Sequence, residues 1–157
     1  MTARKLLVRA HPQGDRRSCF QGKIIEMEMP VTTIFLAEGE RHVLDALCLL
    51  LKEQGDFAIT GEAQSAEVLL TQVCKAAPEV ILLDWNLPGT KAFDHQRLVR
   101  VLRECCPNTK LAVMSVRPED ERIVRDYCLD GFISKQLAPD MFLASLKAIR
   151  TAKNQRE

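Results

Sequence analysis

The chain has 157 residues, of which 46% are hydrophobic and 27% charged, so one domain with a buried core is expected. A formal net charge of +1 gives no electrostatic reason to expect binding to nucleic acid or to a membrane surface. No apolar run is long enough to span a membrane, and the first residues lack the apolar core of a signal peptide, so we expect a cytoplasmic protein. The six cysteines form no C-x-x-C pair, and we expect Cys48, Cys105 and Cys128 to pack as small reduced hydrophobes.

Residues 1–30 differ from the rest because they show no sustained hydrophobic period and contain two glycines, two prolines and many charges. We interpret them as a flexible extension. A second interpretation stays open, in which translation begins at Met27 or Met29, directly before the first expected strand. The folded domain is expected over residues 31–152, followed by a short tail over 153–157.

Short apolar runs alternate with segments of helical periodicity from Val31 onward. The expected strands are 31–37, 57–62, 80–83, 111–114 and 132–133. The expected helices are 41–54, 65–76, one with Leu98, Val101, Leu102 and Cys105 on a single stripe, one that begins at Pro118, and one that begins at Pro139. This alternation predicts an α/β fold of the flavodoxin-like, doubly wound type, with a five-stranded parallel sheet covered by helices on both faces.

Polar residues follow the expected strands where a parallel sheet of this kind places its functional crevice. Glu38 and Gly39 follow the first strand, Asp84 the third, Ser115 the fourth and Lys135 the fifth. Each is ordinary by itself, since an aspartate after a strand is commonly a turn residue. Their order at successive strand ends predicts a shared site. Near the fourth helix, the acids of Glu119 to Glu121 are expected only to favour the positive end of the helix dipole.

The residues around these positions resemble a known family. Leu82-Leu83-Asp84-Trp85-Asn86-Leu87-Pro88-Gly89, Ser115 and Gly131-Phe132-Ile133-Ser134-Lys135 are similar to the matching segments of response regulator receiver domains, the CheY-like proteins. The resemblance extends from about Val31 to Ile149. The segments 82–89 and 115–119 are similar to receivers that precede LuxR-type DNA-binding domains.

The resemblance implies a phosphorelay signalling domain and not an enzyme. It implies that Asp84 accepts the phosphoryl group, that Ser115 and Lys135 assist, and that Phe132 is the switch aromatic. It implies Mg²⁺ held by Glu38, Asp84 and the backbone carbonyl of Asn86. The implied partners are a sensor histidine kinase or phosphotransfer protein and a downstream protein target.

Two features depart from the family pattern. Gly39 stands where receivers carry a second acid, so we expect weakened Mg²⁺ binding unless the longer side chain of Glu40 reaches back. Ser115 and Lys135 are separated by 20 positions (135 − 115), about two fewer than the family usually has, so we expect a short fourth helix or a tight loop before it.

The chain ends at Glu157, directly after the last expected helix. We therefore expect a stand-alone receiver that makes no direct contact with nucleic acid or membrane and signals through protein contacts, with a homodimer as one candidate assembly. The alternative is a pseudo-receiver, which uses the same fold as a phosphorylation-independent interaction module. A flavin-binding enzyme on this scaffold is disfavoured, because the acidic loop 37–41 would repel a phosphate.

Overall fold

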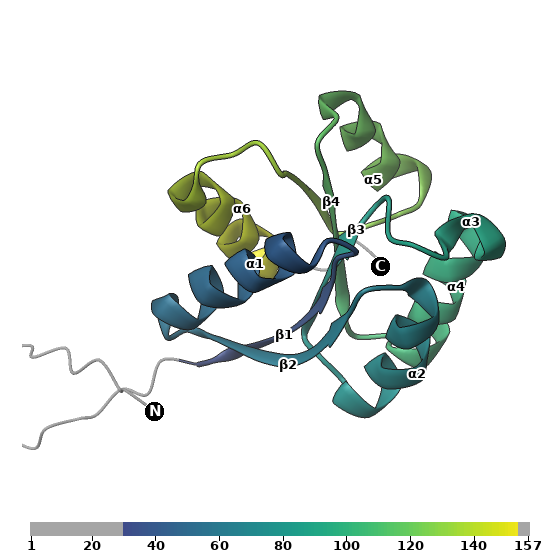
Figure 1. The fold of residues 1–157 in the computed structure, drawn as a ribbon, viewed down its shortest axis with the longest axis horizontal. Helices are drawn as coiled ribbons and strands as arrows, with labels where there is room; N and C mark the ends of the chain where they lie inside the picture. Colours follow the sequence, from purple (N-terminus) through teal and green to yellow (C-terminus); the bar gives the residue numbers. More distant parts are fainter. Residues whose placement is uncertain (1–29, 154–157) are drawn as a thin grey trace, which may run out of the picture.

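A computed structural model describes residues 30–153 of the chain (Figure 1). The expected extension over 1–30 and the tail over 153–157 lie outside the described residues, except for Pro30 and Lys153. The predicted five-stranded parallel sheet is confirmed, and its strands are arranged in the order β2-β1-β3-β4-β5. Its strands are β1 (Thr32–Ala37), β2 (Phe57–Ala63), β3 (Val80–Asp84), β4 (Lys110–Ser115) and β5 (Gly131–Ser134).

Helices follow each strand and cover both faces of the sheet. They are α1 (Arg41–Gln54), α2 (Ala66–Ala76), α3 (Thr90–Phe93), α4 (His95–Cys105), the 3-10 turn η1 (Pro118–Arg122), α5 (Ile123–Asp126) and α6 (Pro139–Thr151). The third crossover is divided at Asp94, which has a φ of 59° and accepts the N–H of Gln96 to cap α4. The fourth crossover has only η1 and one turn of α5, which confirms the short helix predicted from the spacing.

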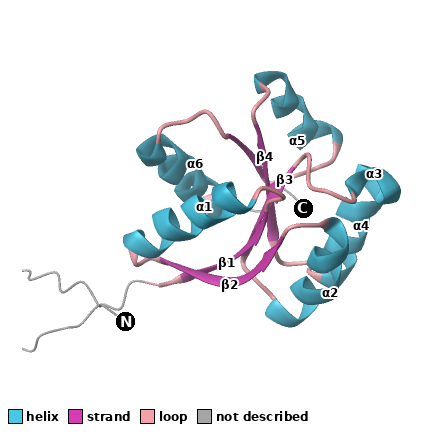
Figure 2. Cartoon of the chain, viewed as in Figure 1, coloured by secondary structure: helices cyan, strands magenta, loops and turns pink. Residues whose placement is uncertain are grey.

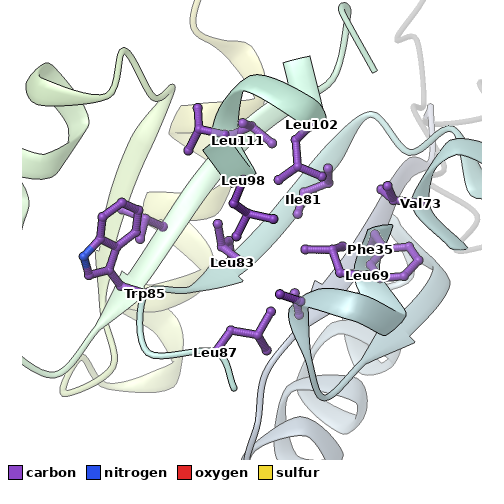
Figure 3. Packing of buried hydrophobic residues seen from close by; sticks show 14 of the residues in the cluster. Phe35, Leu69, Val73, Ile81, Leu83, Trp85, Leu87, Leu98, Leu102 and Leu111 are labelled. Atoms are coloured by element: carbon purple, nitrogen blue, oxygen red, sulfur yellow. The ribbon is translucent and has the colours of Figure 1, made fainter. Parts of the chain in front are cut away.

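Two hydrophobic cores lie on opposite sides of the sheet (Figure 2). Helices α1 and α6 cover one face, and α2, α4 and α5 cover the other. Figure 3 shows the second core, where Leu69 of α2 and Leu98 of α4 lie over Ile81 and Leu83 of β3. Every residue of β3 is buried, because it is the central strand and contacts both layers.

The inward face of α4 differs from the expected stripe. Leu98 and Leu102 are buried as predicted, but the other buried positions are Val99 and Cys106, while Cys105 is exposed. Asp94 caps α4 at its start, and Cys106, the residue at which the chain leaves the helix, packs in the core. Cys128 is also exposed, so of the three cysteines expected in the core only Cys48 is buried.

No helix within residues 30–153 is long and apolar enough to cross a membrane.

Candidate functional site

The carboxyl ends of β1 and β3 and the residue after β5 bring three of the expected site residues into contact. Lys135 Nζ lies 2.6 Å from Glu38 Oε2 and 3.1 Å from Asp84 Oδ1. The Glu38 side chain is fully buried, and the Lys135 side chain is 17% exposed. One ammonium group therefore compensates two carboxylates in a place where an uncompensated charge would be costly.

Local turns fix both carboxylates. Glu38 Oε1 accepts the backbone N–H of Glu40 at 3.0 Å, and Asp84 Oδ1 accepts the backbone N–H of Asn86 at 3.1 Å. The parallel register pairs Ala37 with Leu83, so the two acids that follow leave the sheet at the same level. Within the described part of the chain, the Asp84 side chain makes its hydrogen bond to Asn86 and its ion pair to Lys135 through the same atom, Oδ1.

The charge state of Lys135 follows from its surroundings. Burial by itself lowers the pKa of the Lys135 ammonium, but the hydrogen bond to Glu38 and the negative charge of Asp84 outweigh burial. The pKa is therefore raised above its ordinary value. Lys135 is a permanent cation beside Asp84 at neutral pH.

Ser115, the last residue of β4, is bound to η1. Its backbone carbonyl accepts the N–H of Lys135 at 2.9 Å, which joins it to the strand end that carries the lysine. Its hydroxyl is fully buried and donates to Asp120 Oδ2 at 2.6 Å, while the Arg117 N–H donates to the same hydroxyl at 3.2 Å. Asp120, which is 5% exposed, was missed by sequence reasoning. In the sequence, Asp120 is distinguished only as one of three consecutive acids near the expected start of a helix.

Aromatic side chains pack around Trp85, the residue that follows Asp84 in the chain. Trp85 is buried and stacks on His95 with ring centroids 3.9 Å apart, and Tyr127 meets Trp85 edge-on at 5.0 Å. His95 Nε2 lies 2.8 Å from the Trp85 carbonyl oxygen, so the segment after Asp84 is attached to α4. Phe132 is half-buried on β5 and packs against the same core. Figure 3 shows Trp85 at one edge of this core.

The donor set for a divalent cation is small. A Cβ on Gly39 would lie 2.5 Å from Pro88 Cδ, so the proline ring fills the space that a second acid would need. Glu40 does not substitute for it, because its exposed carboxylate lies 3.3 Å from the His42 ring. Within residues 30–153, no three His, Cys, Asp or Glu side chains are grouped as metal ligands.

The residues present still fit a weakly held cation. Glu38 Oε2 is buried and accepts no hydrogen bond of good geometry from the described residues, and its close partner is the Lys135 ammonium. Together with the Asp84 carboxylate and the backbone carbonyl that Asn86 would supply, such an oxygen atom suits the hard-cation chemistry of Mg²⁺, with water as the remaining ligands.

The family model of the response regulator receiver domain matches residues 34–147, which is more than half of the chain. The phosphate regulon transcriptional regulatory protein PhoB of Klebsiella pneumoniae is 28% identical over 119 residues, which cover 74% of this chain and 50% of that protein. The nitrate/nitrite response regulator protein NarL of Escherichia coli K12 is 27% identical over 116 residues, which cover 73% of this chain and 52% of NarL. The chain spans about half the length of these curated relatives.

Solved structures share the fold. The isolated receiver domain of RcsB from Salmonella enterica serovar Typhimurium, solved with the phosphomimetic BeF₃⁻, superposes with a TM-score of 0.69 at 22% identity, covering 79% of this chain and 91% of that one. A DNA-binding response regulator of the LuxR family from Staphylococcus aureus gives a TM-score of 0.67 at 19% identity, covering 77% and 100% of the two chains.

The expectation that nucleic acid is not a partner is wrong. PhoB is named a transcriptional regulatory protein, and a similar structure (TM-score 0.68, 22% identity, 78% of this chain and 62% of that one) is RcsB bound to the promoter rprA. The expectation rested on the net charge and on where the sequence ends. The net charge of a receiver says nothing of DNA contacts made by other parts of the protein in which it works.

Receiver domains act in two-component phosphorelay signalling, are typically phosphorylated on an aspartate, and generally use Mg²⁺ for that step. The relatives are signalling proteins, which agrees with the expectation that this protein is not an enzyme. With the family model matched over most of the described residues and the fold shared with solved receivers, the chain belongs to the response regulator receiver family.

Proposed function

We propose that Asp84 accepts a phosphoryl group from a phosphohistidine on a sensor histidine kinase or phosphotransfer protein, and that the phosphorylated domain signals through contacts with a downstream protein. The observation that carries the proposal is the ion pair between Lys135 Nζ and Asp84 Oδ1 at 3.1 Å, which leaves Oδ2 without such a contact. A carboxylate oriented by a cation through one oxygen presents the other as a nucleophile.

The transfer balances without an oxidant or reductant. Asp84 Oδ2 forms the new P–O bond, the P–N bond of the phosphohistidine breaks, and its electron pair stays on the imidazole nitrogen, which takes a proton from water. The Lys135 ammonium lies close enough to turn from Asp84 to a phosphoryl oxygen, while Glu38 keeps it in place at 2.6 Å. Mg²⁺, when held by Glu38, Asp84 and the Asn86 carbonyl, supplies positive charge to the phosphoryl oxygens.

The signal leaves the site through Ser115 and Phe132. A hydroxyl that contacts the phosphorylated state and not the free state biases the equilibrium between two conformations. Phe132 lies on β5, the strand next to the one that carries Ser115, so a displacement of Ser115 reaches it through β4–β5 pairing. Because relatives such as PhoB are transcriptional regulators, we include DNA as a target of the assembly in which this receiver acts.

The test is phosphorylation of the purified chain by acetyl phosphate with Mg²⁺, followed by intact-mass measurement. Wild-type protein should gain one phosphoryl group that hydroxylamine removes, because acyl phosphates react with hydroxylamine. Asp84→Asn should gain none. Asp140→Asn, which removes an exposed carboxylate on α6, is the matched control and should be labelled like the wild type.

If the wild-type chain takes up no phosphoryl group, or if Asp84→Asn is labelled equally, the proposal is wrong. The first of these outcomes would leave a phosphorylation-independent interaction module.

A further inference from the structure

Ser115 has a single hydroxyl proton, and in the structure this proton is donated to the carboxylate of Asp120. The hydroxyl donates to Asp120 Oδ2 at 2.6 Å, a short hydrogen bond to a charged acceptor. Ser115 is fully buried and Asp120 is 5% exposed, so water does not compete for the bond. A hydroxyl has one proton to donate, so it cannot serve Asp120 and a phosphoryl oxygen on Asp84 at the same time.

Asp120 is itself held in place by its own turn. Arg117 Nε donates to the same Oδ2 atom at 3.1 Å, and the backbone N–H of Asp120 donates to the Arg117 carbonyl at 3.1 Å. The carboxylate therefore cannot easily follow the serine. If the Ser115 hydroxyl turns elsewhere, the bond to Asp120 breaks.

The position of Ser115 makes this bond relevant to Asp84. Strand β4 pairs with β3 in a register that sets Met114 opposite Asp84, so Ser115 is the next residue along the neighbouring strand. On its other side, its carbonyl accepts the N–H of Lys135. Ser115 therefore lies on the strand between β3, which ends in Asp84, and β5, which precedes Lys135, while its hydroxyl donates to Asp120 of η1.

We propose that Asp120 is a positioning residue that holds the Ser115 hydroxyl away from Asp84, so that the phosphorylated state forms only by breaking the Ser115–Asp120 hydrogen bond. This inference rests on the proposed function of Asp84. Asp120 opposes activation, because its bond to Ser115 exists in the free state and is lost in the phosphorylated one. A weaker bond makes the active state easier to reach.

The experiment measures the affinity of the full chain for beryllofluoride, a phosphoryl mimic, with Mg²⁺ present and Trp85 fluorescence as the readout. Asp120→Asn keeps the shape and an amide oxygen but removes the charge, and should tighten binding severalfold. Asp120→Ala should tighten it by about tenfold, since hydrogen bonds to charged groups are the strong ones. Arg117→Gln changes a side chain that is 55% exposed and should tighten binding by a smaller factor.

The Ser115→Ala background separates positioning from simple structural support. Without the hydroxyl, Asp120→Asn should leave beryllofluoride affinity unchanged, whereas a structural effect would persist in both backgrounds. Thermal melts of every variant confirm folding, and Arg117→Gln provides the readout if the Asp120 variants do not fold.

Two results would overturn the inference in distinguishable ways. If wild-type protein binds beryllofluoride and the Asp120 and Arg117 variants bind it no more tightly, the positioning role is wrong and the function of Asp84 stands. If wild-type protein binds none and acetyl phosphate leaves it unlabelled, both are wrong.

Discussion

Lys135 holds its ammonium 2.6 Å from Oε2 of Glu38, whose side chain is fully buried. Lys135→Met would leave this carboxylate uncompensated beside a second one, Asp84. We expect a loss of about 3 kcal/mol in the free energy of unfolding, because removal of one partner of a buried pair leaves a buried charge. Urea unfolding monitored by circular dichroism measures it.

The control is Arg41→Ala, which removes an ion pair to Asp45 in which both side chains are more than half exposed. This pair should contribute less than about 1 kcal/mol. Adding Glu38→Gln to Lys135→Met should recover part of the lost stability. No recovery would mean that the loss comes from packing of the lysine stem and not from the buried charge.

Mg²⁺ affinity should depend on Glu38. Because two carboxylates remain as ligands, we expect weak binding by the wild type and a further loss in Glu38→Gln. The Mg²⁺ affinity should fall by at least about tenfold, because this is the decrease seen when a residue that only hydrogen-bonds a metal ligand is removed. Quenching of Trp85, the chain's single tryptophan, reports the titration. Glu62→Gln is the control, since Glu62 pairs with Arg41 outside the site. Equal titrations of Glu38→Gln and the wild type would exclude Glu38 as a ligand.

Cys48 should be inert to thiol reagents. Burial and the hydrogen bond from its thiol to Glu62 Oε1 at 3.1 Å raise its pKa to about 11 from an ordinary value of 9.0. The thiolate fraction at pH 8 is therefore lowered by about a hundredfold. Alkylation followed by peptide mapping should label the exposed Cys74 and leave Cys48 unmodified. Equal labelling of the two would contradict the raised pKa.

The same shift makes the contribution of Cys48 to stability depend on pH. The folded state favours the neutral thiol, so the stabilisation is complete below pH 9 and is lost as the pH rises towards 11. The difference in unfolding free energy between the wild type and Cys48→Ala should therefore shrink between pH 8 and pH 10. A difference that stays constant over this range would show that the thiol does not titrate differently in the two states.

Gly61→Ala should destabilise the protein by overpacking. A Cβ on Gly61 would lie 2.3 Å from Cε2 of Phe35, which is fully buried on the neighbouring strand β1. We expect a loss of about 1–3 kcal/mol, measured by urea unfolding. Thr60→Ala, at the exposed neighbouring position, should cost less than about 1 kcal/mol. In the double variant with Phe35→Leu the two losses should be less than additive, and full additivity would rule out the steric contact.

Most of the fold could be predicted from the sequence, because strands and helices follow from hydrophobic patterns within short segments. The apolar run 80–83 predicted a strand buried on both faces, and polar residues after the first, third, fourth and fifth strands predicted a common site once those strands were parallel. The parallel topology brings Lys135 to the same edge of the sheet as Glu38 and Asp84, and its long side chain spans the distance to both.

The remaining features depend on contacts between distant parts of the chain or on irregular turns. Asp120 was expected only as one of three acids at a helix start, but η1 is a 3-10 turn in which this side chain is buried and accepts the Ser115 hydroxyl. The buried face of α4 differs from the stripe expected from the sequence. The chain is also divided at Asp94, whose φ of 59° is not revealed by sequence periodicity. The DNA binding of relatives such as RcsB was not anticipated, because the net charge of one receiver domain does not report on contacts that other domains make.

The contact between Gly39 and Pro88 links two loops that are almost fifty positions apart in the chain (88 − 39 = 49). It makes the two positions sterically interdependent. A Cβ at position 39 meets the proline ring, so a substitution there requires the ring or its loop to shift. Libraries designed to strengthen the proposed cation site therefore need to vary both positions together.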